Sequence, residues 1–451
     1  MLLKLSAEDA TNAAVVQSAI DRVARSGGGE VVLPEIDLLL DRGLQLRSGV
    51  TLRGQGPGTI LRKGPGRVWP LSGYHNYGMC DVPLHSTAGL SEGMTVSVHD
   101  RRTHGGFYET FATIEWVENG WIGLDRGIDA DYSASEEPCV TTSYPVVFGH
   151  RISDVILADL HIEGSAATQD KKMGGCRGGA VYFAQSHDIQ LRGVTEADYD
   201  GEGLSFQMCR NVEIINCRFD RNTGNGLHPG AGSTNCLFQK CTAHGNKMAG
   251  FFFCVRATLI TVHDCTLARN AVGVSIGTRD CFNHILGGKM LNNRGAGVLV
   301  RQTPAPTEVH SIVIEDCTIR GNGRDSKPDN AGRMPQDAAQ VVLTSDAHDI
   351  VLVDNVIERG AAMAAPVGLQ CGEAVHAVQL QGNQFGDDLA TDIEEPADTA
   401  ATVHSSRATP VPFLCGYLGS NTQHVRPASV ASVSPKDRKT LFRHLPPQSR
   451  L

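Results

Sequence analysis

The sequence predicts an all-β solenoid in which short strands wind into a parallel β-helix, and two periodic features predict it. The first is a glycine that opens a short alternating stretch every 23 or 24 residues, at Gly203, Gly226, Gly250, Gly273 and Gly297. The second is a cysteine eight or nine residues before such a glycine, at Cys217, Cys241 and Cys265. A repeat this short holds two or three strands and their Asn- or Gly-rich corners but no helix, which is one coil of a parallel β-helix.

The chain of 451 residues is longer than an ordinary globular domain, but stacked coils add length without enlarging a single core. We therefore expect one main solenoid with an insertion. The expected parts are an N-terminal cap with the first coils over 1–85, an inserted β-hairpin or small β-domain over 86–140, further coils over 141–420, and a flexible tail over 421–451.

An amphipathic helix is predicted at the N-terminus, between Asp9 and Gly27. It places Val16, Ile20 and Val23 on one face and ends at three consecutive glycines. The end of a solenoid presents open strand edges, so a helix that covers it has a physical purpose.

Two N-terminal phrases, TNAAVVQSAIDRVARSGGGEVVLPE and SGVTLRGQGPGTILR, resemble the entry segment of the pectate-lyase-like right-handed parallel β-helix proteins. The run DGEGLSFQ, GLHPGAGS, GFFFC and GVSIGTRD is similar to a set found in uncharacterised bacterial members. The resemblance implies a single-stranded right-handed parallel β-helix with an N-terminal capping helix and a small inserted β-unit. It identifies a fold superfamily and leaves the reaction open, because one fold carries many activities.

Charge and hydropathy argue against several partners. The net charge is −9, the sequence pI is near 6.0, and no Lys/Arg-rich run precedes the C-terminus, so we expect no nucleic-acid partner. No stretch of eighteen apolar residues occurs, so we expect no membrane partner. The segment MLLKLSAEDA has too short an apolar stretch for a secretory signal, which favours a cytoplasmic chain or one already trimmed. A homo-oligomer stays open.

The 13 cysteines are an odd number, and several recur at one phase of the coil. This pattern predicts reduced thiols packed inside the solenoid as small apolar groups, and it favours a reducing compartment. No CxxC pair occurs, and Cys209, Cys217 and Cys254 fall on different phases, so we expect no zinc site. We expect no cofactor, while assistance by calcium stays open.

Side chains in each glycine-led strand should alternate between the interior and the outer surface. The apolar phase points inward, and the opposite phase gives an outward row of Tyr182, Ser205, His228, Phe252, Ser275 and Leu299. The next outward row is Ala184, Gln207, Gly230, Cys254, Gly277 and Arg301. Neighbouring coils lie about 4.8 Å apart, so these rows predict a groove several coils long, which suits a polysaccharide or oligosaccharide.

The candidate catalytic groups of this groove are His228, Asp200, Arg301 and Tyr182. The candidate substrate-binding residues are Gln207, Ser205, Arg256, Arg279, Glu202, Asp198, Lys247 and, in the insertion, Trp116. Glycines such as Gly230 and Gly277 are expected to leave room for a ligand.

Several of these residues have a structural alternative. His228 can cap a turn, Asp200 can belong to an ordinary Asp-Gly turn, and Arg279 can pair with Asp280. Trp116 and its neighbour Trp121 can fill a small core or stack on pyranose rings. The recurring asparagines predict a hydrogen-bonded ladder along one corner rather than a site; they are Asn222, Asn246, Asn270 and Asn293.

The resemblance implies action on a polysaccharide as a lyase, C5-epimerase or glycoside hydrolase, or a non-catalytic role as in adhesins and tailspikes. The Asn-Thr-Asp, Gly-His-Gly and Arg-Ile-Lys phrases of polygalacturonases and the Asp-Pro-His phrase of mannuronan epimerases do not occur in this chain. The resemblance therefore does not identify the reaction.

Uronate β-elimination needs an arginine against the C6 carboxylate and a base for the C5 proton. His228 or Tyr182 can be the base, and the candidate neutralisers are Arg256, Arg279 and Arg301. Inverting hydrolysis needs an acid and a base carboxylate across the bond, for which the candidates are Asp198, Asp200 and Glu202. We expect a uronate lyase or C5-epimerase, with an inverting glycoside hydrolase as the alternative and a non-catalytic glycan-binding β-helix as the second alternative.

Overall fold

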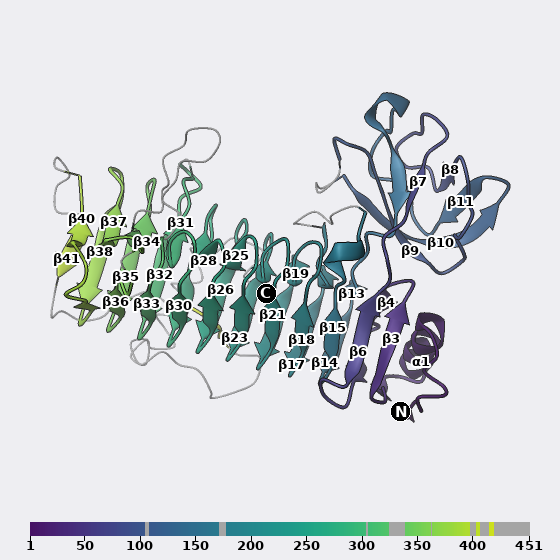
Figure 1. The fold of residues 1–451 in the computed structure, drawn as a ribbon, viewed down its shortest axis with the longest axis horizontal. Coiled ribbons are helices and arrows are strands. Elements are labelled where there is room, and N and C mark those ends of the chain that lie inside the picture. The colour runs from purple at the N-terminus through teal and green to yellow at the C-terminus, as the bar shows by residue number, and fades with distance from the viewer. Residues whose placement is uncertain are drawn as a thin grey trace, which may run out of the picture. The chain divides into compact units, whose positions relative to one another are not determined.

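Short parallel strands dominate the computed structural model of the protein. It describes residues 1–103, 108–170, 177–303, 305–323, 339–361, 363–396, 403–405 and 415–418, so the predicted tail over 421–451 lies outside the described residues. Three long parallel sheets account for the solenoid, and the predicted all-β parallel β-helix is confirmed (Figure 1). The chain divides into two compact units: an N-terminal unit of Met1–Phe206 with Arg218–Leu227, and a C-terminal unit of Gln207–Cys217 with His228–Leu451.

Each complete coil contributes one strand to each sheet, and sheet 1 has one further strand at either end. Sheet 1 contains β1 (Leu2–Lys4), β2 (Gly29–Val32), β5 (Val50–Arg53), β14 (Ser153–Ala158), β17 (His187–Arg192), β20 (Arg210–Ile215), β23 (Thr234–Gln239), β26 (Thr258–His263), β29 (Asn283–Leu286), β32 (His310–Glu315), β35 (His348–Val353), β38 (His376–Gln381) and β41 (Val403–Ser405). Sheet 2 contains β4 (Leu44–Gln45), β13 (Val147–His150), β16 (Val181–Ala184), β19 (Leu204–Gln207), β22 (Leu227–Pro229), β25 (Ala249–Phe252), β28 (Val272–Ile276), β31 (Val298–Val300), β34 (Ala339–Leu343), β37 (Val367–Cys371) and β40 (Thr391–Glu394).

Sheet 3 contains β3 (Ile36–Leu40), β6 (Thr59–Lys63), β15 (His161–Glu163), β18 (Thr195–Ala197), β21 (Arg218–Asp220), β24 (Thr242–His244), β27 (Thr266–Ala268), β30 (Lys289–Leu291), β33 (Thr318–Arg320), β36 (Val356–Glu358) and β39 (Gln384–Phe385). Its strands are mostly three residues long, which explains why the sequence shows them only as short alternating stretches.

The predicted capping helix is α1 (Ala13–Arg25). Asn12 caps it, since its Oδ1 accepts a hydrogen bond from the backbone N–H of Val15 at 3.1 Å. Val16, Ile20 and Val23 are fully buried, as the amphipathic pattern predicts. Within the described ranges, no helix has both the length and the apolar character that crossing a membrane requires.

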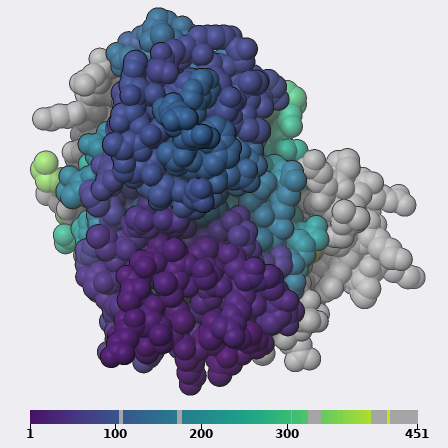
Figure 2. Space-filling model, turned by 90° about the vertical axis from the view of Figure 1, so that its right-hand side faces the viewer, coloured from purple at the N-terminus to yellow at the C-terminus, as the bar shows by residue number. Residues whose placement is uncertain are grey.

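The insertion folds into a six-stranded antiparallel sheet. Its strand order is β7 (Val68–Pro70), β12 (Cys139–Thr141), β9 (Thr95–His99), β10 (Thr110–Glu118), β11 (Trp121–Leu124) and β8 (Asp81–Pro83), so β7 and β8 precede residue 86. Val96, Val98 and Ile122 belong to its own apolar core. Figure 2 shows this inserted sheet in blue above the N-terminal cap in purple.

The pairing of β25, β28 and β31 establishes which side chains point outward in the C-terminal unit. Phe252 pairs with Ser275, and Ser275 pairs with Leu299. The adjacent Phe251 points inward, where its ring centroid lies 4.7 Å from that of Phe238 in sheet 1. The predicted outward phase of these three residues is confirmed.

The predicted asparagine ladder is present in the C-terminal unit. The Asn246 backbone N–H donates to Oδ1 of Asn270 at 2.9 Å, the Asn270 N–H donates to Oδ1 of Asn293 at 2.9 Å, and the Asn293 N–H donates to Asn322 at 3.0 Å. In the N-terminal unit, Asn222 accepts a hydrogen bond from the backbone N–H of Tyr199 at 2.9 Å and donates to Glu196 at 2.8 Å.

The repeating cysteines are interior, as predicted. Cys217, Cys241 and Cys265 are 2, 1 and 1 % exposed, and the twelve cysteines among the described residues are free. Burial and the neighbouring Cys265 raise the pKa of the Cys241 thiol well above its usual range. These thiols therefore act as small apolar groups in the core.

Candidate functional site

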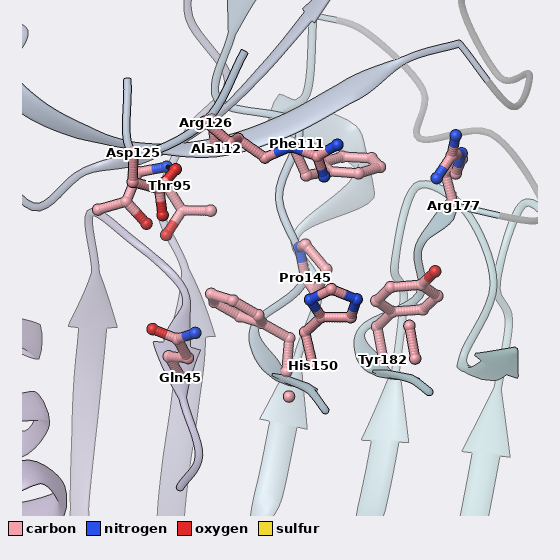
Figure 3. Close-up of a pocket in the computed structure, with 14 residues that line it drawn as sticks. Gln45, Thr95, Phe111, Ala112, Asp125, Arg126, Pro145, His150, Arg177 and Tyr182 are labelled. Carbon is pink, nitrogen blue, oxygen red and sulfur yellow. Dashed lines mark hydrogen bonds between the residues drawn. The ribbon is translucent and has the colours of Figure 1, made fainter. Parts of the chain in front are cut away.

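A cleft of about 150 Å³ lies within the N-terminal unit, where the inserted sheet faces the outer surface of sheet 2 (Figure 3). Its floor comes from β4, β13 and β16, and its other wall comes from β10 and the segment after β11. The cleft therefore joins residues that are far apart in the sequence.

The floor of the cleft is a row of outward side chains. Phe148 pairs with Tyr182 on one side and with Gln45 on the other, so these three residues share the outer face of sheet 2. His150 pairs with Ala184 in the next outward position. Tyr182, predicted to point outward, is half-buried in this floor.

The opposite wall carries Phe111, Asp125 and Arg126, which lie above the floor residues in Figure 3. Asp125 Oδ1 accepts the backbone N–H of Thr113 at 2.9 Å, which ties the segment after β11 to β10. Arg126 donates a hydrogen bond at 2.9 Å to Asp129, which is not among the residues that line the cleft. Asp125 is the single carboxylate among the described residues that line the cleft.

His150 is the ionisable group of the floor that is best suited to accept a proton. Partial burial, with help from the charge of Arg151, holds the pKa of His150 below its usual range, so the neutral ring prevails near neutral pH. Its Nε2 lies 3.1 Å from Oε1 of Gln185, which also accepts a hydrogen bond from Arg151 Nε at 2.8 Å. Because that oxygen can only accept, Nε2 carries the proton and Nδ1 keeps its lone pair.

Arg177 contributes a second cation to the cleft. It lies just before β16, and in Figure 3 the Tyr182 hydroxyl is on the side of its ring that faces Arg177. Two guanidinium groups, Arg126 and Arg177, thus stand opposite a floor of aromatic and imidazole rings. This arrangement can hold an anionic group beside an apolar ring face and move a proton there.

The predicted carboxylates of the N-terminal unit hold the coils together. Asp198 forms an ion pair with Arg221 at 2.9 Å, and Asp200 accepts a hydrogen bond from Thr223 at 2.8 Å. Glu202 is only 2 % exposed and accepts the side-chain amide of Asn225 at 3.1 Å. None of the three lines the cleft, and Ser205 is fully buried.

The predicted groove of the C-terminal unit is largely filled by its own side chains. A Cβ on Gly230 would lie 1.9 Å from the Gln207 amide, and a Cβ on Gly277 would lie 2.0 Å from the Arg301 guanidinium. His228 is 1 % exposed, and its ring centroid lies 5.0 Å from that of Phe252. The expectation that these glycines leave room for a ligand is therefore wrong, because neighbouring long side chains lie over them.

Arg301 is held by several neighbours on this face. It donates to Ser275 Oγ at 2.6 Å and to the Phe253 carbonyl at 3.0 Å, and it stacks 4.1 Å above the Phe252 ring. The fully buried Asp280 lies 3.8 Å from it, and burial raises the pKa of that carboxyl to about 7. Asp280 thus contacts Arg301.

The remaining predicted binding residues lie at corners or on the insertion. Arg279 and Lys247 are exposed, and Arg256 is half-buried. Arg256 and Arg279 both have a positive φ, of 65° and 58°, at equivalent corners. Trp116 is 40 % exposed on the inserted sheet, outside the residues that line the cleft.

No group of three or more His, Cys, Asp or Glu side chains is placed to hold a metal ion in the part of the chain that the structure describes. Sequence reasoning missed the cleft residues Phe148, His150, Arg126 and Arg177. The phrase VVFGH alternates like the other strands of sheet 2, so Phe148 and His150 could have been added to the outward rows.

Comparisons with known proteins agree with this architecture. A family model described as a right-handed beta helix region matches residues 153–311. The A-module of a mannuronan C-5 epimerase from Azotobacter vinelandii is 13 % identical over 87 % of this chain and 93 % of that one, with a TM-score of 0.52. No curated protein matches the sequence.

Two further solved structures are similar at lower TM-scores. An exopolygalacturonase from Thermotoga maritima is 12 % identical over 86 % of this chain and 92 % of that one, with a TM-score of 0.46. The surface adhesin PfbA of Streptococcus pneumoniae is 12 % identical over 84 % and 89 %, with a TM-score of 0.47. At such identities the likeness concerns the fold, and the chain has the right-handed parallel β-helix fold that the N-terminal phrases predicted.

Proposed function

Since the chain has the right-handed parallel β-helix of the pectate-lyase-like superfamily, we propose that it is a carbohydrate-active enzyme. Its substrate is a uronate-containing poly- or oligosaccharide that binds in the cleft and undergoes β-elimination or C5 epimerisation. The observation that carries this proposal is the composition of the cleft: two arginines, a histidine and a tyrosine, but one carboxylate.

The proposed chemistry begins at the uronate carboxylate. Arg126 and Arg177 bind it and neutralise the charge that grows when the C5 proton leaves. His150 accepts that proton, which its neutral state near neutral pH permits. In elimination the C4–O bond then breaks, a C4=C5 double bond forms, and the Tyr182 hydroxyl protonates the departing oxygen. In epimerisation Tyr182 instead returns a proton to C5 from the opposite face.

Hydrolysis is the less favoured enzyme activity. An inverting hydrolase places two carboxyl groups about 6.5–9.5 Å apart across the scissile bond. The cleft lining offers Asp125 alone, and the carboxylates first considered for this role bond to neighbouring coils. A non-catalytic glycan-binding role stays the second alternative, since the same arginines and aromatic floor can hold an acidic sugar.

The row of His228 and Arg301 in the C-terminal unit stays a second proposed location for the reaction. Arg301 is 27 % exposed, so part of its guanidinium can still meet a ligand. Its hydrogen bonds to Ser275 and Phe253 occupy two of its donors, which favours the cleft as the first choice.

The test is an assay panel on polygalacturonate, alginate and neutral glycans. Ultraviolet absorbance detects unsaturated uronate, reducing-end chemistry detects bond cleavage, and deuterium incorporation at C5 in D₂O detects epimerisation. We expect unsaturated product or C5 exchange on a polyuronate. New reducing ends without unsaturation would establish the hydrolase, and binding without any of the three signals would establish the non-catalytic protein.

A further inference from the structure

Two exposed indoles lie on one face of the inserted sheet, outside the cleft lining. Trp116 and Trp121 are 40 and 39 % exposed. Trp116 pairs with Gly123 across β10 and β11, and Glu118 pairs with Trp121. Directly paired residues share a face of an antiparallel sheet, so both indoles lie on the face opposite to the core residue Ile122.

Both rings are supported from beneath or from the side. A Cβ on Gly123 would lie 1.9 Å from Nε1 and 2.1 Å from Cε2 of Trp116, so this indole rests directly on the glycine. The Trp121 ring meets the ring of His75, which is 7 % exposed, at a centroid distance of 6.2 Å and an angle of 66°. Rings held in this way lose little conformational freedom on binding.

The size of this surface decides between classes of ligand. A tryptophan presents about 150–250 Å², so two indoles exposed to about 40 % offer roughly 120–200 Å². A stable protein interface needs about 800 Å² on each partner, which is several times more. The apolar face of one or two pyranose rings fits the available area.

The charges beside the indoles indicate which glycan. Glu118 is exposed beside Trp121, and Asp81, paired with Gly123, has a side chain that is 42 % exposed. Carboxylates accept hydrogen bonds from sugar hydroxyls but repel the carboxylates of uronates and anionic lipid head groups. Neutral pyranose rings suit these neighbours best.

We propose that Trp116 and Trp121 form a second glycan-binding surface, which binds the ring faces of a neutral pyranose chain. This surface acts by binding alone and stands independently of the reaction in the cleft.

Tryptophan fluorescence tests the proposal, because the third tryptophan, Trp69, is 6 % exposed and belongs to the core of the insertion. The full chain is titrated with cellohexaose, mannohexaose and hexagalacturonate. We expect a blue shift and protection from acrylamide quenching with a neutral hexasaccharide. Trp116→Ala and Trp121→Ala should each weaken that binding about tenfold, the loss that one aromatic contact of about 1.4 kcal/mol implies.

Tyr77→Ala is the matched control, since Tyr77 is a 69 % exposed aromatic residue of the same insertion. It should bind as the parent does. The proposal fails if neither neutral probe binds, if both tryptophan variants keep the parent affinity, or if hexagalacturonate binds more tightly than the neutral probes. Binding at the indoles by a protein that leaves every polysaccharide unchanged would overturn the proposed enzyme and leave this surface in place.

Discussion

At the scale of single residues, the sequence showed which strand phase points outward but not which residues share a cleft. Tyr182 was placed correctly on the outer face. Phe148 lies directly beside it, yet the two are 34 residues apart, against 23 or 24 in the glycine repeat. This longer coil interrupts the repeat, so the sequence did not identify His150, two residues beyond Phe148, as an outward residue of the same face.

Clearance above a glycine could not be read from the sequence either. Gly230 and Gly277 do lack side chains, but Gln207 and Arg301 lie across them. Which long side chain covers a glycine depends on its rotamer and on hydrogen bonds such as that of Gln207 to the Ala231 N–H at 2.7 Å.

The pH dependence of the reaction should reflect the state of His150. Its pKa lies below 6.5, so the ring loses its proton at a lower pH than free histidine does and can act as a base there. We expect the acid limb of the kcat/KM profile below pH 6.5. Arg151→Ala removes one of the positive charges that lower this pKa, and the limb should move to higher pH. An acid limb unchanged by that substitution would argue against His150 as the base.

At the scale of elements, Lys63 connects β6 with two segments that follow the insertion in the sequence. The side chain is 2 % exposed, its Nζ donates to the Thr142 carbonyl at 2.9 Å and contacts Gln169, and it lies 4.4 Å from the Tyr144 ring centre. Burial lowers its pKa from 10.5 to about 7. No sequence pattern distinguished this lysine, because its burial results from the return of the chain after the insertion.

Lys63 predicts a pH-dependent stability. Between pH 7 and 10.5 the unfolded chain holds a proton on Lys63 that the folded chain has released. The contribution of Lys63 to the free energy of unfolding therefore increases as the pH rises through this range. It is most unfavourable below pH 7, where the buried amine must carry its charge. In Lys63→Met this contribution is absent. We therefore expect the urea midpoint of Lys63→Met, minus that of the parent, to be higher at pH 6 than at pH 9. If the midpoints of variant and parent differ by the same amount at both pH values, the lowered pKa of Lys63 is contradicted.

The asparagine ladder is the element-scale feature that the sequence predicted best, because a recurring polar residue at a buried corner needs a partner in the next coil. Asn270→Ala should leave the N–H of Asn246 and the carbonyl of Ala243 without their bonds, at about 1–3 kcal/mol for each buried group. The urea midpoint measures the loss. Gln302→Ala removes an exposed amide as the control and should leave the midpoint unchanged.

At the scale of the whole molecule, the repeat was enough to predict the fold class, because each coil contacts only its neighbours and each obeys the same pattern. The cleft could not be predicted from the sequence, because it forms where the inserted sheet meets sheet 2. That meeting places Arg126 above His150, through contacts that leave no period in the sequence (Figure 3).

The rate of C5 chemistry in Tyr182→Phe, on the polyuronate that the parent converts, tests the proposed reaction in the cleft most directly. The substitution keeps the aromatic floor and removes only the proposed proton donor. We predict a fall in kcat of about 10²–10⁴-fold with little change in substrate affinity. The same change at the exposed Tyr77 should have no effect. Full activity in Tyr182→Phe would contradict the proposal that the reaction takes place in this cleft.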